Sequence, residues 1–226
     1  MDNRLAMAGG SSAPAGSLGV SVTRDLGVLR STSRWEAMRW KIKNFLTNGW
    51  RGLPALYVMK YVGKIFGVVY IKTSLSLKVI RGDGTVLNLG VVGRRVVTTT
   101  GGGFIIDAFQ NLVELETMNY HGFGTGTGAE GASDTALGTE FTTEYATDNV
   151  RPTGSQSEAS ALVLQTIGTF VPNSGGTLAV TEHGLFSQAA VAGGVLLDRT
   201  KFSAVNLVAS ADQLVATYQF TVVAGS

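Results

Sequence analysis

The stretch Thr177–Asp198, TLAVTEHGLFSQAAVAGGVLLD, decides how the rest of the chain is interpreted. It begins as a strand that carries Glu182 and His183 towards a glycine and a further apolar step. Small residues closed by Gly193-Gly194 then favour a turn, and the apolar run Val195–Leu197 favours a buried strand. The stretch therefore predicts two strands joined by a turn, and we expect the other strands to pack against them.

The composition favours a mainly β protein. The 226 residues include 30 glycines, 4 prolines and no cysteine, and 44% are hydrophobic. Many glycines suit the tight turns of antiparallel sheets, and a chain of this length can bury a large core. We predict an antiparallel β-sandwich or jelly-roll-like body at residues 66–226, preceded at residues 1–65 by an N-terminal arm and one amphipathic helix. Without cysteine, a disulfide framework and thiolate metal sites are excluded.

Alternating hydrophobic and polar residues predict the other strands of the body. The hairpin signal is clearest at Gly82-Asp83-Gly84, between a strand from about Phe66 and another from Val86. Immunoglobulin-like and jelly-roll connectivity both fit the pattern. The remaining predicted elements are strands at Arg94–Thr98, Thr139–Tyr145, Ala159–Phe170, Phe202–Val208 and Leu214–Val223, a helix at Phe104–Val113 after the glycines 101–103, and a helical turn at Ser133–Gly138.

A basic amphipathic helix is predicted before the body. Ser33 precedes Glu36 with the spacing of a capping box, and Asn48-Gly49 is typical of a helix end. Apolar residues recur at steps of three to four, with basic residues on the other faces. The stripe could pack on the protein's own sheet, dock in a groove of a partner or lie on a membrane surface. We predict partner binding through Trp35, Met38, Arg39, Trp40, Lys41, Ile42, Lys43 and Phe45.

Charge is distributed unevenly along the chain. Residues 1–100 contain 15 basic and 4 acidic side chains, whereas residues 101–226 contain 3 basic and 12 acidic ones. The basic half is expected to dock on an acidic surface of another copy or of a different protein, or on nucleic acid. The acidic second half argues against nucleic acid. Three lysines interrupt the apolar run 53–77, which argues against a membrane span, and the start of the chain lacks the apolar run of a secretory signal.

No motif predicts catalysis or a cofactor. His121 and His183 are the only histidines, and no serine lies in a GxSxG elbow. The stretch HGFGTGTG fits neither a P-loop nor a dinucleotide-binding loop, and it favours a strand edge that another backbone approaches closely. Glu182 and His183 should point to opposite faces of a strand, so they are not expected to share a metal. We expect Glu182 to pair with Arg199, and His183 to bond a backbone group.

Several blocks of sequence, taken in order, resemble virion structural proteins of tailed bacteriophages. They are GVVGRRVVTT, FIIDAFQN, MNYHGFGTGTGAEGASDTALGTE, TEHGLFSQAA and LLDRTKFSAVNL. The resemblance spans about residues 90–223, and it implies a virion component that is assembled in many copies in the host cytoplasm and has no catalytic role or cofactor.

Four hypotheses follow from these observations. The first is a capsid cement or decoration protein that binds the major capsid protein, other virion proteins or copies of itself. The others are a neck, tail or fibre component, a nucleic-acid-binding structural protein, and a carbohydrate-binding host receptor module. A cement protein is expected in hundreds of copies per particle and a neck, tail or fibre component in a small fixed number.

Overall fold

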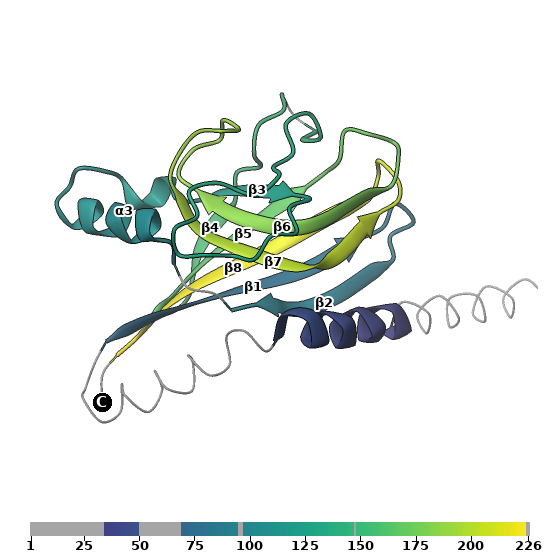
Figure 1. Ribbon diagram of the computed structural model, residues 1–226, viewed down its shortest axis with the longest axis horizontal. Coiled ribbons are helices and arrows are strands. Elements are labelled where there is room, and N and C mark those ends of the chain that lie inside the picture. Colours follow the sequence, from purple (N-terminus) through teal and green to yellow (C-terminus); the bar gives the residue numbers. More distant parts are fainter. Residues whose placement is uncertain (1–33, 50–68, 95–96, 147, 225–226) are drawn as a thin grey trace, which may run out of the picture.

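The computed structural model describes residues 34–49, 69–94, 97–146 and 148–224. Within these ranges the strands form two antiparallel sheets of a mainly β, sandwich-like body, as the sequence predicts (Figure 1). The five-stranded sheet has the order β2-β1-β8-β5-β4, and the three-stranded sheet has the order β3-β6-β7. The strands are β1 (Tyr70–Ile80), β2 (Val86–Gly93), β3 (Tyr120–Gly124), β4 (Ser155–Ser160), β5 (Val163–Phe170), β6 (Leu178–Phe186), β7 (Leu196–Leu207) and β8 (Gln213–Val223).

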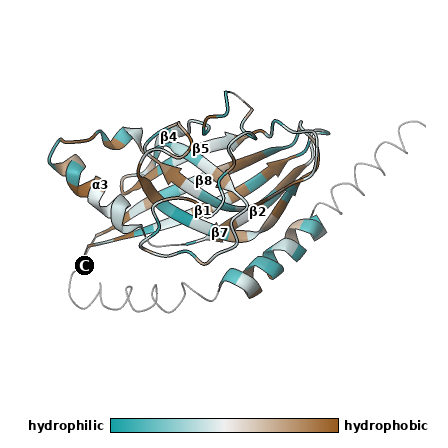
Figure 2. Cartoon of the chain, turned by 45° about the horizontal axis from the view of Figure 1, so that its top comes forward, coloured by the Kyte–Doolittle hydropathy of each residue, from teal (hydrophilic) through white to brown (hydrophobic). Residues whose placement is uncertain are grey.

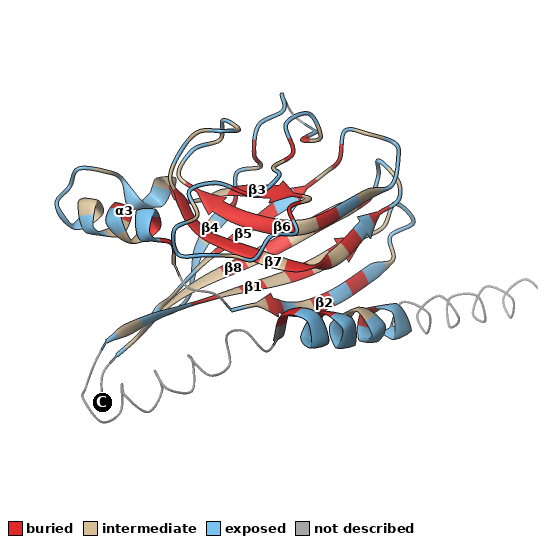
Figure 3. Cartoon of the chain, viewed as in Figure 1, coloured by how far each residue is buried: buried red, intermediate tan, exposed pale blue. Residues whose placement is uncertain are grey.

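The main core lies between the two sheets. Leu75, Leu77 and Val79 of β1 are buried and alternate with partly exposed residues, so one face of the strand supplies the core. β8 pairs with β1 along its length and places Ala216 opposite Leu77 in the same buried layer. Figure 2 shows the alternation of hydrophobic and hydrophilic residues along the strands, and Figure 3 shows the buried residues gathered on them.

The stretch 177–198 forms the hairpin β6–β7 that the sequence predicts. Phe186 ends β6 and Leu196 begins β7, and both side chains are buried. Gly194 in the turn has φ +78°, a left-handed conformation that favours glycine. β7 is longer than predicted, because Val195–Leu197 and Phe202–Val208 were expected to be separate strands. The polar residues between them were interpreted as the end of one strand and the start of another. In the structure, Asp198 and its neighbours are buried and hydrogen-bonded inside one continuous strand.

The hairpin between β1 and β2 confirms the turn predicted at Gly82-Asp83-Gly84. Gly84 has φ +82°, and the Thr85 backbone N–H donates to Asp83 Oδ1 at 2.8 Å. Asp212 closes the turn before β8 by accepting hydrogen bonds from the Gly82 backbone N–H at 3.0 Å and from Val208 N at 2.8 Å. These bonds join the two turns at one end of the larger sheet.

The second helix, α3 (Thr99–Phe109), begins earlier than predicted. The expected strand Arg94–Thr98 is not formed in its described residues, because β2 ends at Gly93 and Thr98 caps the helix by accepting a hydrogen bond from Gly101 N at 2.9 Å. The three glycines expected to end that strand lie inside the helix. A Cβ at Gly101 would meet the backbone of Leu197 at 2.7 Å, so glycine permits α3 to pack closely on β7. Because glycine has a low helix propensity, the sequence pattern did not predict that α3 begins at Thr99.

Three further predictions are wrong in detail. The stretch Ser133–Gly138 forms turns and no helix, and Thr139–Tyr145 contributes isolated bridges in place of a strand. The strand predicted at Ala159–Phe170 is the end of β4 and all of β5, joined by a tight turn. Backbone N–H groups of the segment 125–145, such as those of Gly126, Gly138 and Thr139, donate to the Glu182 side chain and not to a neighbouring strand. The alternation of hydrophobic and polar residues does not predict bonds of this kind.

The N-terminal helix comprises residues 34–44 and continues as a π-helical turn, η1 (Phe45–Gly49), to the predicted end. It lies alongside β2 in Figure 1. The predicted arm and Ser33 of the capping box lie outside the described residues. Among the helices of the described ranges, none has the length and apolar character needed to cross a membrane.

Candidate assembly surface

One face of the N-terminal helix is fastened to the body. Asn44 is buried, its Nδ2 donates to Val92 O of β2 at 2.9 Å, and its Oδ1 accepts from Ser203 N of β7 at 2.9 Å. Trp40 Nε1 donates to Ser203 O and Ala204 O at 3.1 and 3.0 Å. β2 and β7 are edge strands of the two sheets, so the helix bridges one side of the sandwich and satisfies polar backbone groups there.

The same face continues along the helix. Ala37 is buried in the main core cluster, and Asn48 Nδ2 donates to Asn44 Oδ1 at 3.0 Å. Thr47 Oγ1 lies 3.0 Å from Ser203 Oγ of β7. At 3.6 residues per turn, positions 37, 44 and 48 fall on one side of a helix. These contacts fix the rotation of the helix about its own axis, and therefore decide which side chains face outwards.

The outward face carries an apolar stripe of five residues, which we call the helix face. The exposed fractions are 63% for Trp35, 53% for Met38, 52% for Ile42, 50% for Phe45 and 63% for Leu46. Scattered exposed apolar residues are ordinary on protein surfaces, but a contiguous set of large ones marks an interaction site. The helix face is therefore a candidate binding surface.

Basic residues border the helix face on both sides. From the 3.6-residue period, Arg39 and Lys43 lie along one border and Arg34 and Lys41 along the other. All four side chains are exposed. An apolar centre with a charged rim is the usual anatomy of a protein–protein interface. The arrangement suits an acidic partner with an apolar depression.

The structure divides the eight residues predicted to bind a partner into two groups. Trp40 faces the protein's own body and is partly buried, so it anchors the helix. Packing of the stripe on the protein's own sheet was one of the interpretations open from the sequence, but the five side chains are half or more exposed in the described part of the chain. The other seven residues, Trp35, Met38, Arg39, Lys41, Ile42, Lys43 and Phe45, are exposed together on the outer side.

The anchoring residues were missed because they do not look like core residues. Asn44 and Asn48 are polar, and Ala37 is small, so the apolar stripe dominated the periodic pattern. The spacing of the two asparagines and the alanine on one helical face was the available signal. A pair of asparagines four residues apart can bond each other and nearby backbone groups.

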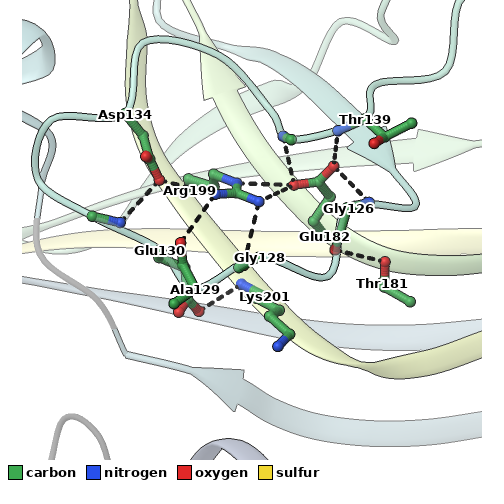
Figure 4. Close-up of polar contacts among 12 residues, drawn as sticks. Gly126, Gly128, Ala129, Glu130, Asp134, Thr139, Thr181, Glu182, Arg199 and Lys201 are labelled. Atoms are coloured by element: carbon green, nitrogen blue, oxygen red, sulfur yellow. Dashed lines mark hydrogen bonds and ion pairs between the residues drawn. The ribbon is translucent and has the colours of Figure 1, made fainter.

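The glycine-rich stretch after β3 binds a carboxylate of the protein itself. Glu182 is fully buried, and its two carboxylate oxygens accept hydrogen bonds from Gly126 N at 2.8 Å, Gly138 N at 3.0 Å and Thr139 N at 2.7 Å (Figure 4). A Cβ at Gly124 would clash with the carbonyl of Thr139. This confirms the predicted close approach of another backbone, and the described loop folds onto an internal anion.

Arg199 completes this buried cluster and confirms the predicted pair. Its Nε donates to Glu182 at 2.9 Å and its Nη1 to Asp134 at 3.0 Å. Burial alone would lower the pKa of Arg199, but the hydrogen bonds to Asp134 and Glu182 outweigh it and raise that pKa. The cluster therefore ties β6 and β7 to the loop 126–139.

His183 points to the opposite side of β6 from Glu182, as expected from strand alternation. Among the described residues the His183 ring bonds no backbone group, so the predicted bond to the backbone is wrong. Its Nε2 lies 2.9 Å from Nδ1 of His121, whose Nε2 lies 3.1 Å from Thr166 Oγ1. Across the described residues, no group of three or more His, Cys, Asp or Glu side chains is placed to hold a metal ion.

The chain matches no protein-family model and no curated protein. The geometry of the helix face and of the body that supports it is therefore the basis for the functional proposal.

Proposed function

We propose that this chain is a structural protein of a tailed-bacteriophage virion, and that it acts as a capsid cement or decoration protein. The observation that carries the proposal is the helix face, an exposed apolar stripe between basic borders on a helix that the body holds in one orientation. The sequence blocks that resemble phage virion proteins support the assignment to a particle. In this proposal the β body is the rigid part and the helix face makes the contact.

The helix face can supply much of the binding free energy. Burying a large apolar side chain yields about 1.5 to 3 kcal/mol relative to leaving it exposed, and tryptophan and other large residues at the centre of an interface often dominate affinity. Because Asn44 and Trp40 hold the helix before binding, little ordering entropy is lost on docking. A preorganised helix can then stabilise a shell through many repeated, individually modest contacts.

The basic borders select the partner. Exposed charges contribute more to the rate and register of association than to affinity. Arg34, Arg39, Lys41 and Lys43 would accelerate encounter with an acidic surface of the major capsid protein or of another copy. Salt should slow this encounter, because exposed charges are screened over about 8 Å at physiological ionic strength.

The test is incorporation into particles. In the variant Arg39→Glu/Lys43→Glu, two exposed side chains along one basic border of the helix face change sign. Lys72→Glu/Arg94→Glu makes the same charge change at exposed positions outside the helix. We expect the first variant to be lost from purified particles and the second to be retained. Normal incorporation of both variants would contradict docking through the helix face.

Copy number tests the position in the particle. Quantitative mass spectrometry of purified particles, relative to the major capsid protein, should give a ratio near one or a simple fraction of it. A handful of copies would instead favour a neck, tail or fibre component. Absence from particles would overturn the virion proposal and return attention to a nucleic-acid-binding role for the basic helix.

A further inference from the structure

A second apolar surface lies at the end of the sandwich where α3 is placed. It is a cavity of ≈ 410 Å³, within the range of pockets that take a ligand or a group of side chains. Its floor is the inner face of β1, β5 and β8, and its walls are α3, η2 (Leu115–Thr117) and the nearby ends of β6 and β7. We call this cavity and its edge the α3 groove.

The groove is open because the smaller sheet does not cover the whole inner face of the larger one. Beyond the buried layer, β1 and β8 continue to Ile71 and Val222, which line the groove together with Phe220. From the opposite side, Phe109 projects from α3 with 84% of its surface exposed. Leaving this much apolar surface exposed costs free energy that burial against a partner would recover.

Acidic residues accompany the groove. Glu114 and Glu116 flank the groove residue Leu115. Glu114 and Glu116 are exposed. The basic Lys72 of β1 follows Ile71 and therefore points to the opposite face of the sheet. The α3 groove thus pairs an apolar depression with acidic neighbours, the complement of an apolar stripe with basic borders.

The helix face cannot fill the groove of its own copy. The N-terminal helix lies along β2, whereas α3 stands at the far end of the sheets (Figure 1). Hydrogen bonds from Trp40 and Asn44 to β2 and β7 hold the helix in that place. We propose that the helix face of one copy docks in the α3 groove of a second copy, as an amphipathic helix docks in a hydrophobic groove.

The two surfaces are different, so the contact is heterologous. Each pair of docked copies still presents one helix face and one groove that have not docked, and the assembly grows into a ring if the rotation closes or into a filament if it does not. The inference rests on the proposed function in one respect, since it names the partner of the helix face used there. A protein that links its own copies head to tail would suit a lattice that covers a particle.

The test uses the full chain with two complementary defects. Ile42→Ser/Phe45→Ser removes apolar contacts of the helix face but leaves the groove, and Phe109→Ser/Leu115→Ser does the reverse. Val86→Ser/Val208→Ser is the matched control, because those valines are exposed elsewhere. Sedimentation velocity and mass photometry over a concentration series would report the oligomers, and circular dichroism would verify folding.

We expect the unaltered chain and the control to form oligomers and each defective variant to be monomeric, with the dissociation constant raised at least about tenfold. Mixing the two defective variants should give a 1:1 dimer that does not grow, because one intact face and one intact groove remain. A charge reversal, Arg39→Glu/Lys43→Glu with Glu114→Lys/Glu116→Lys in one chain, should restore oligomers that either pair alone abolishes.

Several results would overturn the inference. These are a monomer at every concentration, a mixture that stays monomeric, or a small molecule found in the groove by native mass spectrometry. A melting temperature that falls with the groove substitutions in a monomer would show that the chain's own residues occupy the groove. If self-association is absent but Arg39→Glu/Lys43→Glu is still lost from particles, the inference fails and the proposed function stands. If the unaltered chain self-associates but Arg39→Glu/Lys43→Glu is incorporated normally, docking through the helix face in the particle is rejected.

Discussion

His121 and His183 face each other inside the sandwich, with Nδ1 of His121 and Nε2 of His183 2.9 Å apart and both side chains completely buried. One ring nitrogen must donate and the other accept, so the hydrogen bond requires that at least the accepting ring be neutral. Nδ1 of His183 has no hydrogen-bond partner among the described residues. The pair is therefore poorly placed to accept an additional proton.

Acid should weaken the fold through this pair. Burial lowers the pKa of His121 to about 3, and burial together with His121 lowers the pKa of His183 well below 6.5. Below about pH 6.5 the unfolded chain binds protons that the folded chain does not. The stabilisation is complete above that pH and is lost as the pH falls towards 3, at up to about 1.4 kcal/mol per pH unit for each histidine.

Urea denaturation at pH 7.5, 6.5, 5.5 and 5.0 would measure this loss, in a range above the ordinary pKa of carboxyl groups. The free energy of unfolding should fall slightly between the first two values and steeply from pH 6.5 to pH 5.0. Constant stability down to pH 5.0 would contradict the burial of neutral histidines.

Glu182→Gln should destabilise the body strongly. It leaves Arg199 buried with Asp134 as its remaining carboxylate partner and weakens three backbone hydrogen bonds. Breaking a buried ion pair by removing one partner costs about 3 to 5 kcal/mol. Glu158→Gln, at an exposed position of β4, is the matched control for urea denaturation. Equal midpoints for the two variants would show that the cluster contributes little.

Phe186→Ala and Leu196→Ala should each lower the free energy of unfolding, by about 3 to 5 and 2 to 5 kcal/mol. Both side chains are buried, and the Arg151 guanidinium lies 3.5 Å from the centre of the Phe186 ring, so that truncation also removes a cation–π contact. Val208→Ala, on an exposed side chain, should change the melting temperature little. An unchanged melting temperature for Phe186→Ala would mean that the face of β6 is assigned wrongly.

Two neighbouring glycines of α3 should respond in opposite directions to alanine. Gly101→Ala forces a Cβ against the Leu197 backbone and should destabilise, whereas a Cβ at Gly102 meets nothing within 4 Å. Since alanine is favoured over glycine within a helix by about 0.5 to 1 kcal/mol, Gly102→Ala should stabilise. Differential scanning calorimetry of the two variants checks the signs. If Gly101→Ala stabilises the protein, α3 must lie further from β7 than in the structure.

Asn44→Ala should loosen the N-terminal helix while the sheets stay folded. It removes the partners of Val92 O and Ser203 N, and a buried polar group left unsatisfied costs about 1 to 3 kcal/mol. Hydrogen–deuterium exchange should rise across residues 34–49 and remain unchanged in β6. Lys43→Ala, next to it but exposed, serves as the control. Equal protection in both variants would show that Asn44 does not anchor the helix.

Sequence patterns predicted the parts of the fold that depend on local chemistry. The turn at Gly84 needs a left-handed residue, and the alternation of Leu75, Leu77 and Val79 identifies the buried face of β1. The pairing of Glu182 with Arg199 could also be predicted, because the two oppositely charged residues lie on the two strands of one hairpin. These features need little knowledge of distant contacts.

The features that were missed depend on residues far apart in sequence. Gly101 belongs to a helix because the helix must lie against Leu197, and Asp198 stays within β7 because Thr73 supplies a buried hydrogen bond at 2.8 Å. The exposure of the helix face was left open for the same reason. The contacts of Asn44 with both sheets, together with those of Trp40, decide which side of the helix points outwards.

The bridge that Asn44 makes between β2 and β7 has a consequence beyond orienting the helix. Unpaired edge strands are templates for uncontrolled strand addition and aggregation, and native proteins often cover them with a helix. Here the covering helix also carries the exposed apolar stripe, so the element proposed to recruit a partner would also block random sheet extension. A chain that lost this helix would lose the proposed specific contact and expose an edge open to nonspecific strand addition.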